Sequence, residues 1–240
     1  MSGRIVPSET WRADFKREFM RKAFKALWFN GISGDYLEFG SCGGMTFTLA
    51  YEQSRQVGNH CKLWSFDSFQ GLPDPAGAPD EHPRWQKGAM SMSLEKFTEI
   101  CQQHKMPASD YQLVPGYYSD TIGSEDSIGG LPHDVALAYI DCDLYSSTKI
   151  VLSFLGKRLK HGMIIAFDDY YCFSKSALSG ERKALLEFTL SDRRFNFAPY
   201  VQFGWAGMSF IVEDKSLIPE GAEPSSPRGR RLFSMRWPAW

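Results

Sequence analysis

The chain has 240 residues, of which 43% are hydrophobic and 15% aromatic, enough for one large α/β domain with a sizeable core. Its 27 basic and 28 acidic residues leave a net charge of −1, so nothing indicates a nucleic-acid partner. No apolar run approaches the ~20 residues of a membrane span, and the N-terminus lacks the apolar stretch of a signal peptide. The five cysteines form no C-x-x-C pair, which favours reduced thiols in a cytoplasmic protein over a zinc site.

The first predicted element is a helix between Ser8 and Asn30, because apolar residues recur there at intervals of three and four residues. We therefore expect an N-terminal helical extension (1–34) that packs on a single α/β domain (35–214). A C-terminal tail (215–240) follows, rich in proline, serine and arginine, with the unusually aromatic end LFSMRWPAW. The N-terminal helix and this tail are candidate dimer surfaces, which leaves a homo-oligomer open.

Five short apolar segments predict strands of one sheet, at 35–40, 62–67, 111–116, 134–141 and 162–168. Helical patterns separate or follow them, at 45–55, 93–104, 146–160 and 179–192, the third with a serine cap. Two more segments, 197–204 and 207–214, predict a closing strand pair joined by a turn at Trp205–Ala206. This order predicts an open, doubly wound, mostly parallel seven-stranded sheet with an antiparallel edge.

Ligands of such a sheet bind at the carboxyl ends of its strands. The first predicted strand runs into the glycine-rich turn Glu38–Gly44, where a ligand can approach the backbone and a helix N-terminus. The second strand ends in Asp67, about where an acid binds ribose hydroxyls in nucleotide-binding folds. Either feature alone is as readily a tight turn or a cap, but together with acidic ends on two more strands they predict a site.

Those two strands each end in a pair of aspartates, in AYIDCDLYSST (138–148) and GMIIAFDDYY (162–171). A buried carboxylate is costly without a partner, and oxygen ligands suit a hard divalent cation such as Mg²⁺ or Ca²⁺. We expect Asp141, Asp168 and Asp169 to lie within a few ångströms of each other and to share such an ion. Asp143 lies on the same side of the strand as Asp141 by the two-residue period, one step further into solvent, where it could transfer a proton.

These motifs make the chain resemble the macrocin O-methyltransferase family, from about Tyr36 to Asp214. The resemblance rests on LEFG, FDSFQGLP, PGYYSDT, IDCDLYSST, GMIIAFDDY and GERKALLEF. It implies a Rossmann-like class I methyltransferase fold. It also implies an enzyme that uses S-adenosyl-L-methionine and a divalent metal to methylate a sugar hydroxyl on a natural product or glycan.

The same resemblance implies roles for individual residues. Mg²⁺ would be held by Asp141, Asp168 and Asp169, and Asp143 would be the general base. The implied cofactor contacts are Glu38, Gly40, Ser41, Gly44, Asp67, Ser68 and Ser119.

The proline- and glycine-rich loop 72–90 is too irregular for a helix or strand and is placed to close over the acceptor. Its Trp85 could stack on a sugar face or only anchor the loop. Three alternatives for the whole chain stay open: an O-methyltransferase of a catechol-like or other small molecule, an Asp-x-Asp glycosyltransferase, and a methyltransferase-like scaffold that binds without turnover.

Overall fold

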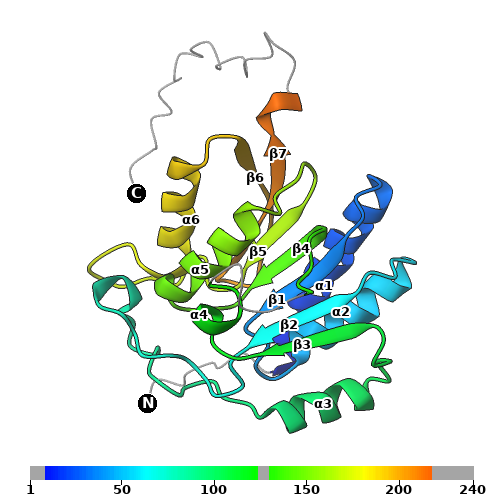
Figure 1. Ribbon diagram of the computed structural model, residues 1–240, viewed down its shortest axis with the longest axis horizontal. Helices are drawn as coiled ribbons and strands as arrows, with labels where there is room; N and C mark the ends of the chain where they lie inside the picture. The colour runs from blue at the N-terminus through cyan, green and yellow to red at the C-terminus, as the bar shows by residue number, and fades with distance from the viewer. Residues whose placement is uncertain (1–8, 124–129, 218–240) are drawn as a thin grey trace, which may run out of the picture.

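The fold is a single seven-stranded sheet with helices on both faces, as the computed structural model in Figure 1 shows. The structure describes residues 9–123 and 130–217; the aromatic tail segment LFSMRWPAW lies outside these residues. The strand order is β3-β2-β1-β4-β5-β7-β6. Strands β1 to β5 are parallel, and β7 runs antiparallel to both β5 and β6. The predicted sheet with its antiparallel edge is confirmed.

Every predicted strand is present, with its ends within two residues of the predicted ones. The strands are β1 (Asp35–Phe39), β2 (Leu63–Asp67), β3 (Tyr111–Pro115), β4 (Val135–Ile140), β5 (Ile164–Phe167), β6 (Phe195–Phe203) and β7 (Gly207–Asp214). The helices are α1 (Glu9–Phe29), α2 (Met45–Gln56), α3 (Leu94–Gln103), α4 (Tyr118–Thr121), α5 (Tyr145–Gly156) and α6 (Gly180–Ser191). Short 3₁₀ turns lie at Ala78–Asp80 and Lys215–Leu217.

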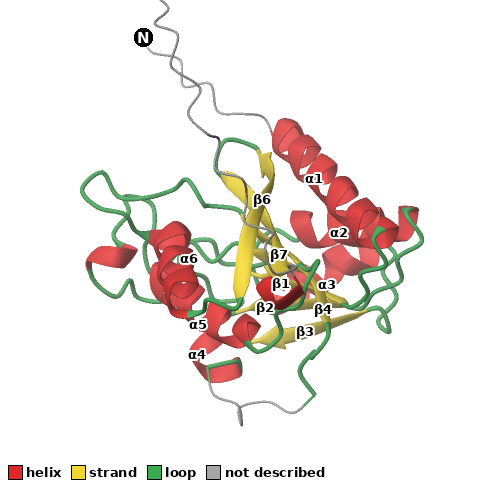
Figure 2. Ribbon diagram, turned by 90° about the horizontal axis from the view of Figure 1, so that it is seen from above, coloured by secondary structure: helices red, strands yellow, loops and turns green. Residues whose placement is uncertain are grey.

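The helices form two layers, with α1, α2 and α3 on one face of the sheet and α4, α5 and α6 on the other (Figure 2). Strand β4 is buried along its whole length, and its side chains alternate between the two layers. Leu137 and Tyr139 pack in the core beneath α1 and α2, whereas Ala138 and Ile140 pack in the core beneath α5 and α6. A central strand covered on both faces explains why its sequence is a continuous apolar run.

Helix α1 is packed into the domain along one side. Its residues Phe19, Phe24 and Leu27 are almost fully buried, and the Phe19 ring stacks on Phe203 of β6 with 4.4 Å between ring centroids. The helix also lies against α2. The apolar residues whose three- and four-residue spacing predicted this helix therefore form the face that packs against α2 and the antiparallel edge of the sheet.

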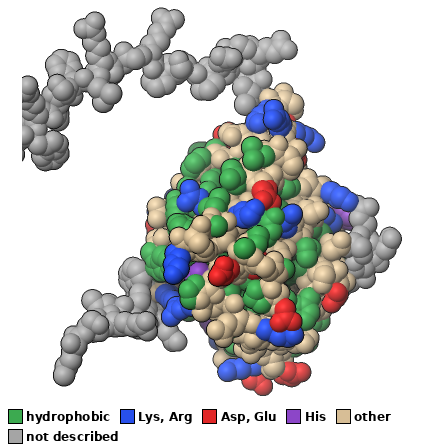
Figure 3. Space-filling model, turned by 90° about the vertical axis from the view of Figure 1, so that its left-hand side faces the viewer, with side chains coloured by type: hydrophobic (Ala, Val, Ile, Leu, Met, Phe, Trp, Pro, Cys, Tyr) green, Lys and Arg blue, Asp and Glu red, His purple; other side chains and the backbone are tan. Residues whose placement is uncertain are grey.

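On the face shown in Figure 3, basic and acidic side chains are interspersed with hydrophobic ones. This mixture agrees with a net charge close to zero. Among residues 9–123 and 130–217, no helix is both long enough and apolar enough to cross a membrane.

The strand order reverses between β1 and β4, and the carboxyl ends of β1, β2, β4 and β5 share one edge of the sheet. At this edge the turn after β1 lies directly against the loop after β4. Gly40 makes the contact: a Cβ atom there would lie 2.0 Å from the backbone oxygen of Asp141, and the residue has φ +87°. Such a reversal of strand order is where ligands bind in open α/β sheets.

Replacing Gly40 by alanine tests how strongly the fold depends on this approach. We expect Gly40→Ala to lower the free energy of unfolding by roughly 3 kcal/mol or more, because the left-handed conformation and the clash with backbone add. Gly43→Ala is the matched control, since Gly43 has φ +85° but nothing within 4 Å of its Cβ position; about 1 kcal/mol is expected there. Urea unfolding measures both, and equal losses in the two variants would show that the close approach has no cost.

Candidate active site

A cavity of about 880 Å³ opens at this edge of the sheet. Its walls come from α1, the turn after β1, the ends of β2 and β3, the loops after β4 and β5, the turn between β6 and β7, and the long loop between β2 and α3. Eight of the eleven predicted site residues line it: Gly40, Asp67, Ser68, Ser119, Asp141, Asp143, Asp168 and Asp169. The fold therefore brings the predicted cofactor and metal residues to one cavity.

The other three predicted residues lie behind the cavity wall. Glu38 is fully buried and accepts a hydrogen bond from the Tyr36 hydroxyl, and burial raises its pKa to about 8. Ser41 is also buried, and its hydroxyl accepts a hydrogen bond from Ser65 at 2.9 Å. Gly44 precedes α2 with φ +65°. In this structure all three support the turn after β1, and their role as cofactor contacts stays a prediction.

Asp67, the last residue of β2, links two loops of the cavity. Its carboxylate oxygens accept hydrogen bonds from the backbone N–H groups of Ser41 and Phe69, each at 2.7 Å. Burial raises the pKa of Asp67. A carboxylate has about four lone-pair positions, so this arrangement leaves acceptor capacity for ligand hydroxyls facing the cavity.

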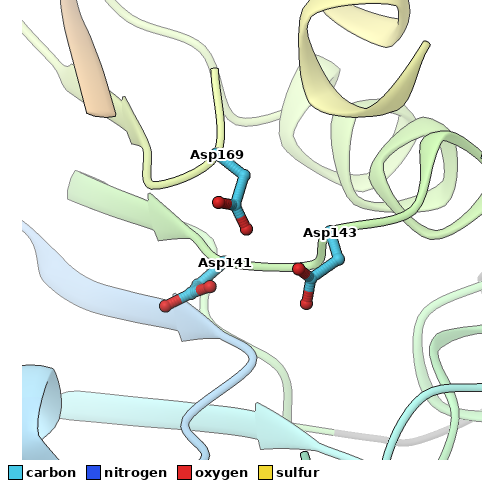
Figure 4. A group of neighbouring side chains, drawn as sticks. All are labelled: Asp141, Asp143 and Asp169. Atoms are coloured by element: carbon cyan, nitrogen blue, oxygen red, sulfur yellow. The ribbon is translucent and has the colours of Figure 1, made fainter. Parts of the chain in front are cut away.

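Three carboxylates gather where β4 and β5 end (Figure 4). Oxygen atoms of Asp141, Asp143 and Asp169 lie within 4.8 Å of one another. The two strands bring them together because Ile140 of β4 pairs with Phe167 of β5, and acidic residues follow both. Burial raises the pKa of Asp141 and Asp143 well above the usual range, and neighbouring carboxylates raise it further.

The position of Asp143 differs from the expected one. Strand β4 ends at Ile140, so the two-residue period of a strand does not extend to Asp143. Asp143 instead takes a left-handed conformation, φ +59°, and is only 5% exposed, so it does not lie further into solvent than Asp141. Its carboxyl group lies beside that of Asp169, with oxygens of the two within 4.8 Å of each other. A non-glycine residue in this conformation at a cavity is a common feature of functional sites.

Asp168 faces α1 and stands apart from this group of three. Its carboxylate accepts hydrogen bonds from the Tyr139 hydroxyl and, at 3.0 Å, from Lys16 Nζ. Lys16 Nζ also lies 3.7 Å from Asp141 Oδ2. Burial alone would lower the pKa of Lys16, but Asp168 and Asp141 together raise it above its usual value. The predicted role of Asp168 as a metal ligand stays a prediction.

Glu181, at the start of α6, joins the two acidic loops. It is fully buried, and its two carboxylate oxygens accept hydrogen bonds from the backbone N–H groups of Cys142 and Asp169, each at 3.0 Å. One side chain thus fixes the spacing between the loops after β4 and β5. The sequence contains this residue in GERKALLEF but gives no local sign that it reaches back to the strand ends.

The long loop between β2 and α3 is anchored to the same region by Asp80. This buried carboxylate accepts hydrogen bonds from the backbone N–H groups of Ser146 at 2.9 Å and Ala76 at 2.7 Å. Ser146 is in the first turn of α5, so the predicted serine cap is wrong: the residue before the helix, Leu144, makes no side-chain cap, and the acceptor comes from the loop. Asp143 likewise does not cap the helix in this structure.

Trp85 is the second anchor of this loop. It is 4% exposed and packs with Leu144, Cys172 and Ala206. The contact requires a glycine at position 180, because a Cβ atom there would lie 2.7 Å from the Trp85 ring. The structure therefore favours the anchoring role over sugar stacking for Trp85, and the loop forms a fixed wall of the cavity.

Comparison with known proteins agrees with this arrangement. The family model described as Macrocin-O-methyltransferase (TylF) matches residues 14–188, well over half of the chain. The chain is 27% identical over 147 residues to 8-demethyl-8-(2,3-dimethoxy-alpha-L-rhamnosyl)-tetracenomycin-C 4'-O-methyltransferase of Streptomyces olivaceus, an alignment that covers 59% of this chain and 54% of the relative. It is 26% identical over 161 residues to demethyldecarbamoylnovobiocin O-methyltransferase of Streptomyces niveus, which covers 64% and 59%. The chain thus spans little more than half of the length of these curated relatives.

Solved structures resemble the fold as a whole. The O-methyltransferase NovP superposes with a TM-score of 0.67 at 20% identity, over 82% of this chain and 79% of that one. The calicheamicin methyltransferase CalS11 superposes with a TM-score of 0.64 at 21% identity, over 81% and 77%. An O-methyltransferase from Bacillus cereus in complex with SAH gives 0.53 at 8% identity, over 86% and 93%. These likenesses confirm the class I O-methyltransferase fold.

The family model reaches from α1 into α6 and so includes the turn after β1, Asp67, both pairs of aspartates and Glu181. Its boundaries enclose every residue that the sequence placed in the site. The motifs, the fold and this match agree, and the chain belongs to the macrocin O-methyltransferase family.

Proposed function

We propose that the chain is an O-methyltransferase that uses S-adenosyl-L-methionine and Mg²⁺ to methylate a hydroxyl group of a sugar on a natural product or glycan. The observation that carries the proposal is the meeting of Asp141, Asp143 and Asp169 in the same cavity as Asp67 and the glycine turn. One curated relative is named as the 4'-O-methyltransferase of a dimethoxyrhamnosyl tetracenomycin, which supports a sugar or glycoside acceptor, and the other is named as a demethyldecarbamoylnovobiocin O-methyltransferase.

The cofactor half of the cavity lies over β1 and β2. Gly40 and its neighbours provide close access to backbone, and Asp67 offers carboxylate oxygens to ribose hydroxyls. Ser68 and Ser119 line the same half. The Bacillus cereus neighbour, which shares the fold, carries SAH. S-adenosyl-L-methionine would supply an electrophilic methyl group, and these residues would orient it toward the carboxylates.

The acidic half suits a hard cation because the side chains that gather there, those of Asp141, Asp143 and Asp169, offer carboxylate oxygens. Asp141, Asp168 and Asp169 are the proposed ligands of Mg²⁺. When bound, the ion would lower the pKa of a sugar hydroxyl and orient it. The crowding of acids supports this fit, since burial and the charges of Asp168 and Asp169 raise the pKa of Asp141 in the protein without metal.

Asp143 is the proposed general base. Without metal, burial and neighbouring carboxylates raise its pKa, and a bound cation would offset part of that rise. Its carboxylate would accept the proton of the acceptor hydroxyl. Glu181 and Asp80 do not face the acceptor in this scheme; they hold the loops that carry Asp141, Asp143 and Asp169. Methyl transfer itself depends mainly on such positioning.

The cofactor part predicts that Asp67→Ala weakens binding of S-adenosyl-L-methionine or its demethylated product. In the wild type we expect a dissociation constant in the micromolar range, which corresponds to a binding free energy on the order of 8 kcal/mol. The dissociation constant of the variant should rise about tenfold or more, because hydrogen bonds to a charged group are lost. Calorimetric titration measures this. Asp110→Ala, which removes a carboxylate paired with Arg55 outside the cavity, is the control, and equal affinity in all three proteins would remove Asp67 from the site.

The metal part predicts that EDTA abolishes turnover and that added Mg²⁺ or Mn²⁺ restores it. Asp141→Ala should bind Mn²⁺ at least about tenfold more weakly, since a ligand carboxylate is lost. Methyl-transfer assays and Mn²⁺ titration measure the two effects. Full turnover in a metal-free preparation would contradict the proposal, and circular dichroism before and after EDTA separates loss of metal from loss of fold.

If Asp143 is the general base, the variant Asp143→Asn should still bind metal and cofactor, but its kcat should fall by about 10²–10⁴. In the wild type, kcat should rise with pH as Asp143 loses its proton; burial raises the pKa that sets this rise, and the bound cation lowers it. In the variant the remaining rate should recover partly at higher pH, because more acceptor hydroxyl then ionises without help. If Asp143→Asn weakens Mn²⁺ binding together with turnover, Asp143 is a ligand; if turnover is unchanged, it has no part in the reaction.

A further inference from the structure

Lys16 brings a positive charge from α1 into the acidic half of the cavity, and neither the motifs nor the family match assigns it a role. Its side chain is 13% exposed and lines the cavity. The lysine lies 152 residues before Asp168 in the chain. Its position on the N-terminal helix makes that helix part of the proposed metal site.

The contacts of Lys16 involve two of the three proposed metal ligands. Its Nζ lies 3.0 Å from Asp168 Oδ2 and 3.7 Å from Asp141 Oδ2. The other oxygen of Asp168 accepts a hydrogen bond from the Tyr139 hydroxyl, and the ammonium also lies 5.7 Å from the centre of the Tyr139 ring. The ammonium therefore lies beside one oxygen of each carboxylate, and a metal ion bound by Asp141 and Asp168 would compete with it for these oxygens.

The packing of α1 fixes where this charge lies. One turn further along the helix, Phe19 is buried and stacks on Phe203. Phe15, next to Lys16, fills the space beside Gly204, where a Cβ atom would lie 2.7 Å from its ring. Lys16 is thus held by a helix that is anchored on the antiparallel edge of the sheet.

A single ammonium offsets only part of the charge of the acidic half. Four aspartates and Glu181 meet there, and buried carboxylates without a cation are strongly unfavourable. Lys16 lowers this cost in the protein without metal. By the same charge it repels a divalent ion that approaches Asp141 and Asp168.

We propose that Lys16 is a built-in counter-ion of the acidic cluster that competes with the metal ion for Asp141 and Asp168 and so sets the metal affinity of the site. It is a positioning residue, because it acts through the two carboxylates. The inference rests on the proposed metal site. Metal either displaces the ammonium or binds beside it, and in both cases the affinity is lower than with a neutral side chain at position 16.

The test compares Mn²⁺ affinity in wild type, Lys16→Met, Lys16→Arg and Lys22→Met by calorimetric titration of the full chain at one pH and ionic strength. We expect Lys16→Met to bind Mn²⁺ at least about tenfold more tightly, because the repulsion and the competition are gone. Lys16→Arg, which keeps the charge, should bind within about threefold of wild type. Lys22→Met is the control, since Lys22 is exposed on the same helix and pairs only with Glu18 in the described part of the chain.

Thermal unfolding gives a second readout that a purely structural lysine would not change in this way. In EDTA, Lys16→Met should unfold at a lower temperature than wild type, and added Mn²⁺ should raise its unfolding temperature by more than it raises that of wild type. If Lys16→Met does not fold in EDTA, Lys16→Gln, which keeps hydrogen-bonding capacity, takes its place in both measurements.

The outcomes separate this inference from the proposed function. Wild type that binds Mn²⁺, with Lys16→Met binding it within twofold or more weakly, overturns the counter-ion role and leaves the metal site standing. No Mn²⁺ binding by either protein overturns both. Tighter binding by Lys16→Met together with wild-type affinity in Lys22→Met and near-wild-type affinity in Lys16→Arg supports the inference.

Discussion

The structure depends on holding several carboxylates together at the buried edge where β4 and β5 end. Burial raises the pKa of Asp141, Asp143 and Asp169, and the charge of neighbouring aspartates raises it further. Three kinds of group hold the cluster in place: the Lys16 ammonium, the Tyr139 hydroxyl, and the backbone N–H groups that Glu181 binds. The strands, the two helix layers and the anchored loop are arranged so that these groups meet at one point.

Local sequence patterns predicted the sheet and most of the cavity because both follow from short-range regularities. The apolar run of β4 has to be covered on both faces, and the acids after β4 and β5 have to meet because neighbouring parallel strands end at the same edge. Asp67 follows from the same reasoning, because it ends β2, which lies two strands from β4 at the same edge of the sheet. The predicted strand ends are correct within two residues, because the strands were recognised from short apolar segments.

What the patterns missed depends on contacts between distant segments. Lys16, Asp80 and Glu181 reach their partners across 12 to 152 residues of chain, and none of them stands in a local pattern that names the partner. The error about the solvent exposure of Asp143 has a different cause: the two-residue period was extended beyond the end of β4, where the chain turns into a left-handed conformation. The serine cap is wrong because α5 begins at Tyr145, so Ser146 lies inside the helix, and Asp80 accepts the hydrogen bond of its backbone N–H.

The anchored loop allows the surface of the cavity wall to change while the positions of the carboxylates stay fixed. Asp80 and Trp85 are buried and fix the loop to α5 and α6, whereas Asp74 and Arg84 are exposed on the same cavity wall. Replacement of the exposed residues alters the cavity wall and leaves in place the anchors of the loop, Asp80 and Trp85. Within a family whose curated relatives are named for different compounds, a wall of this kind would let the surface of the cavity diversify, by evolution or by design, while the positions of the carboxylates stay unchanged.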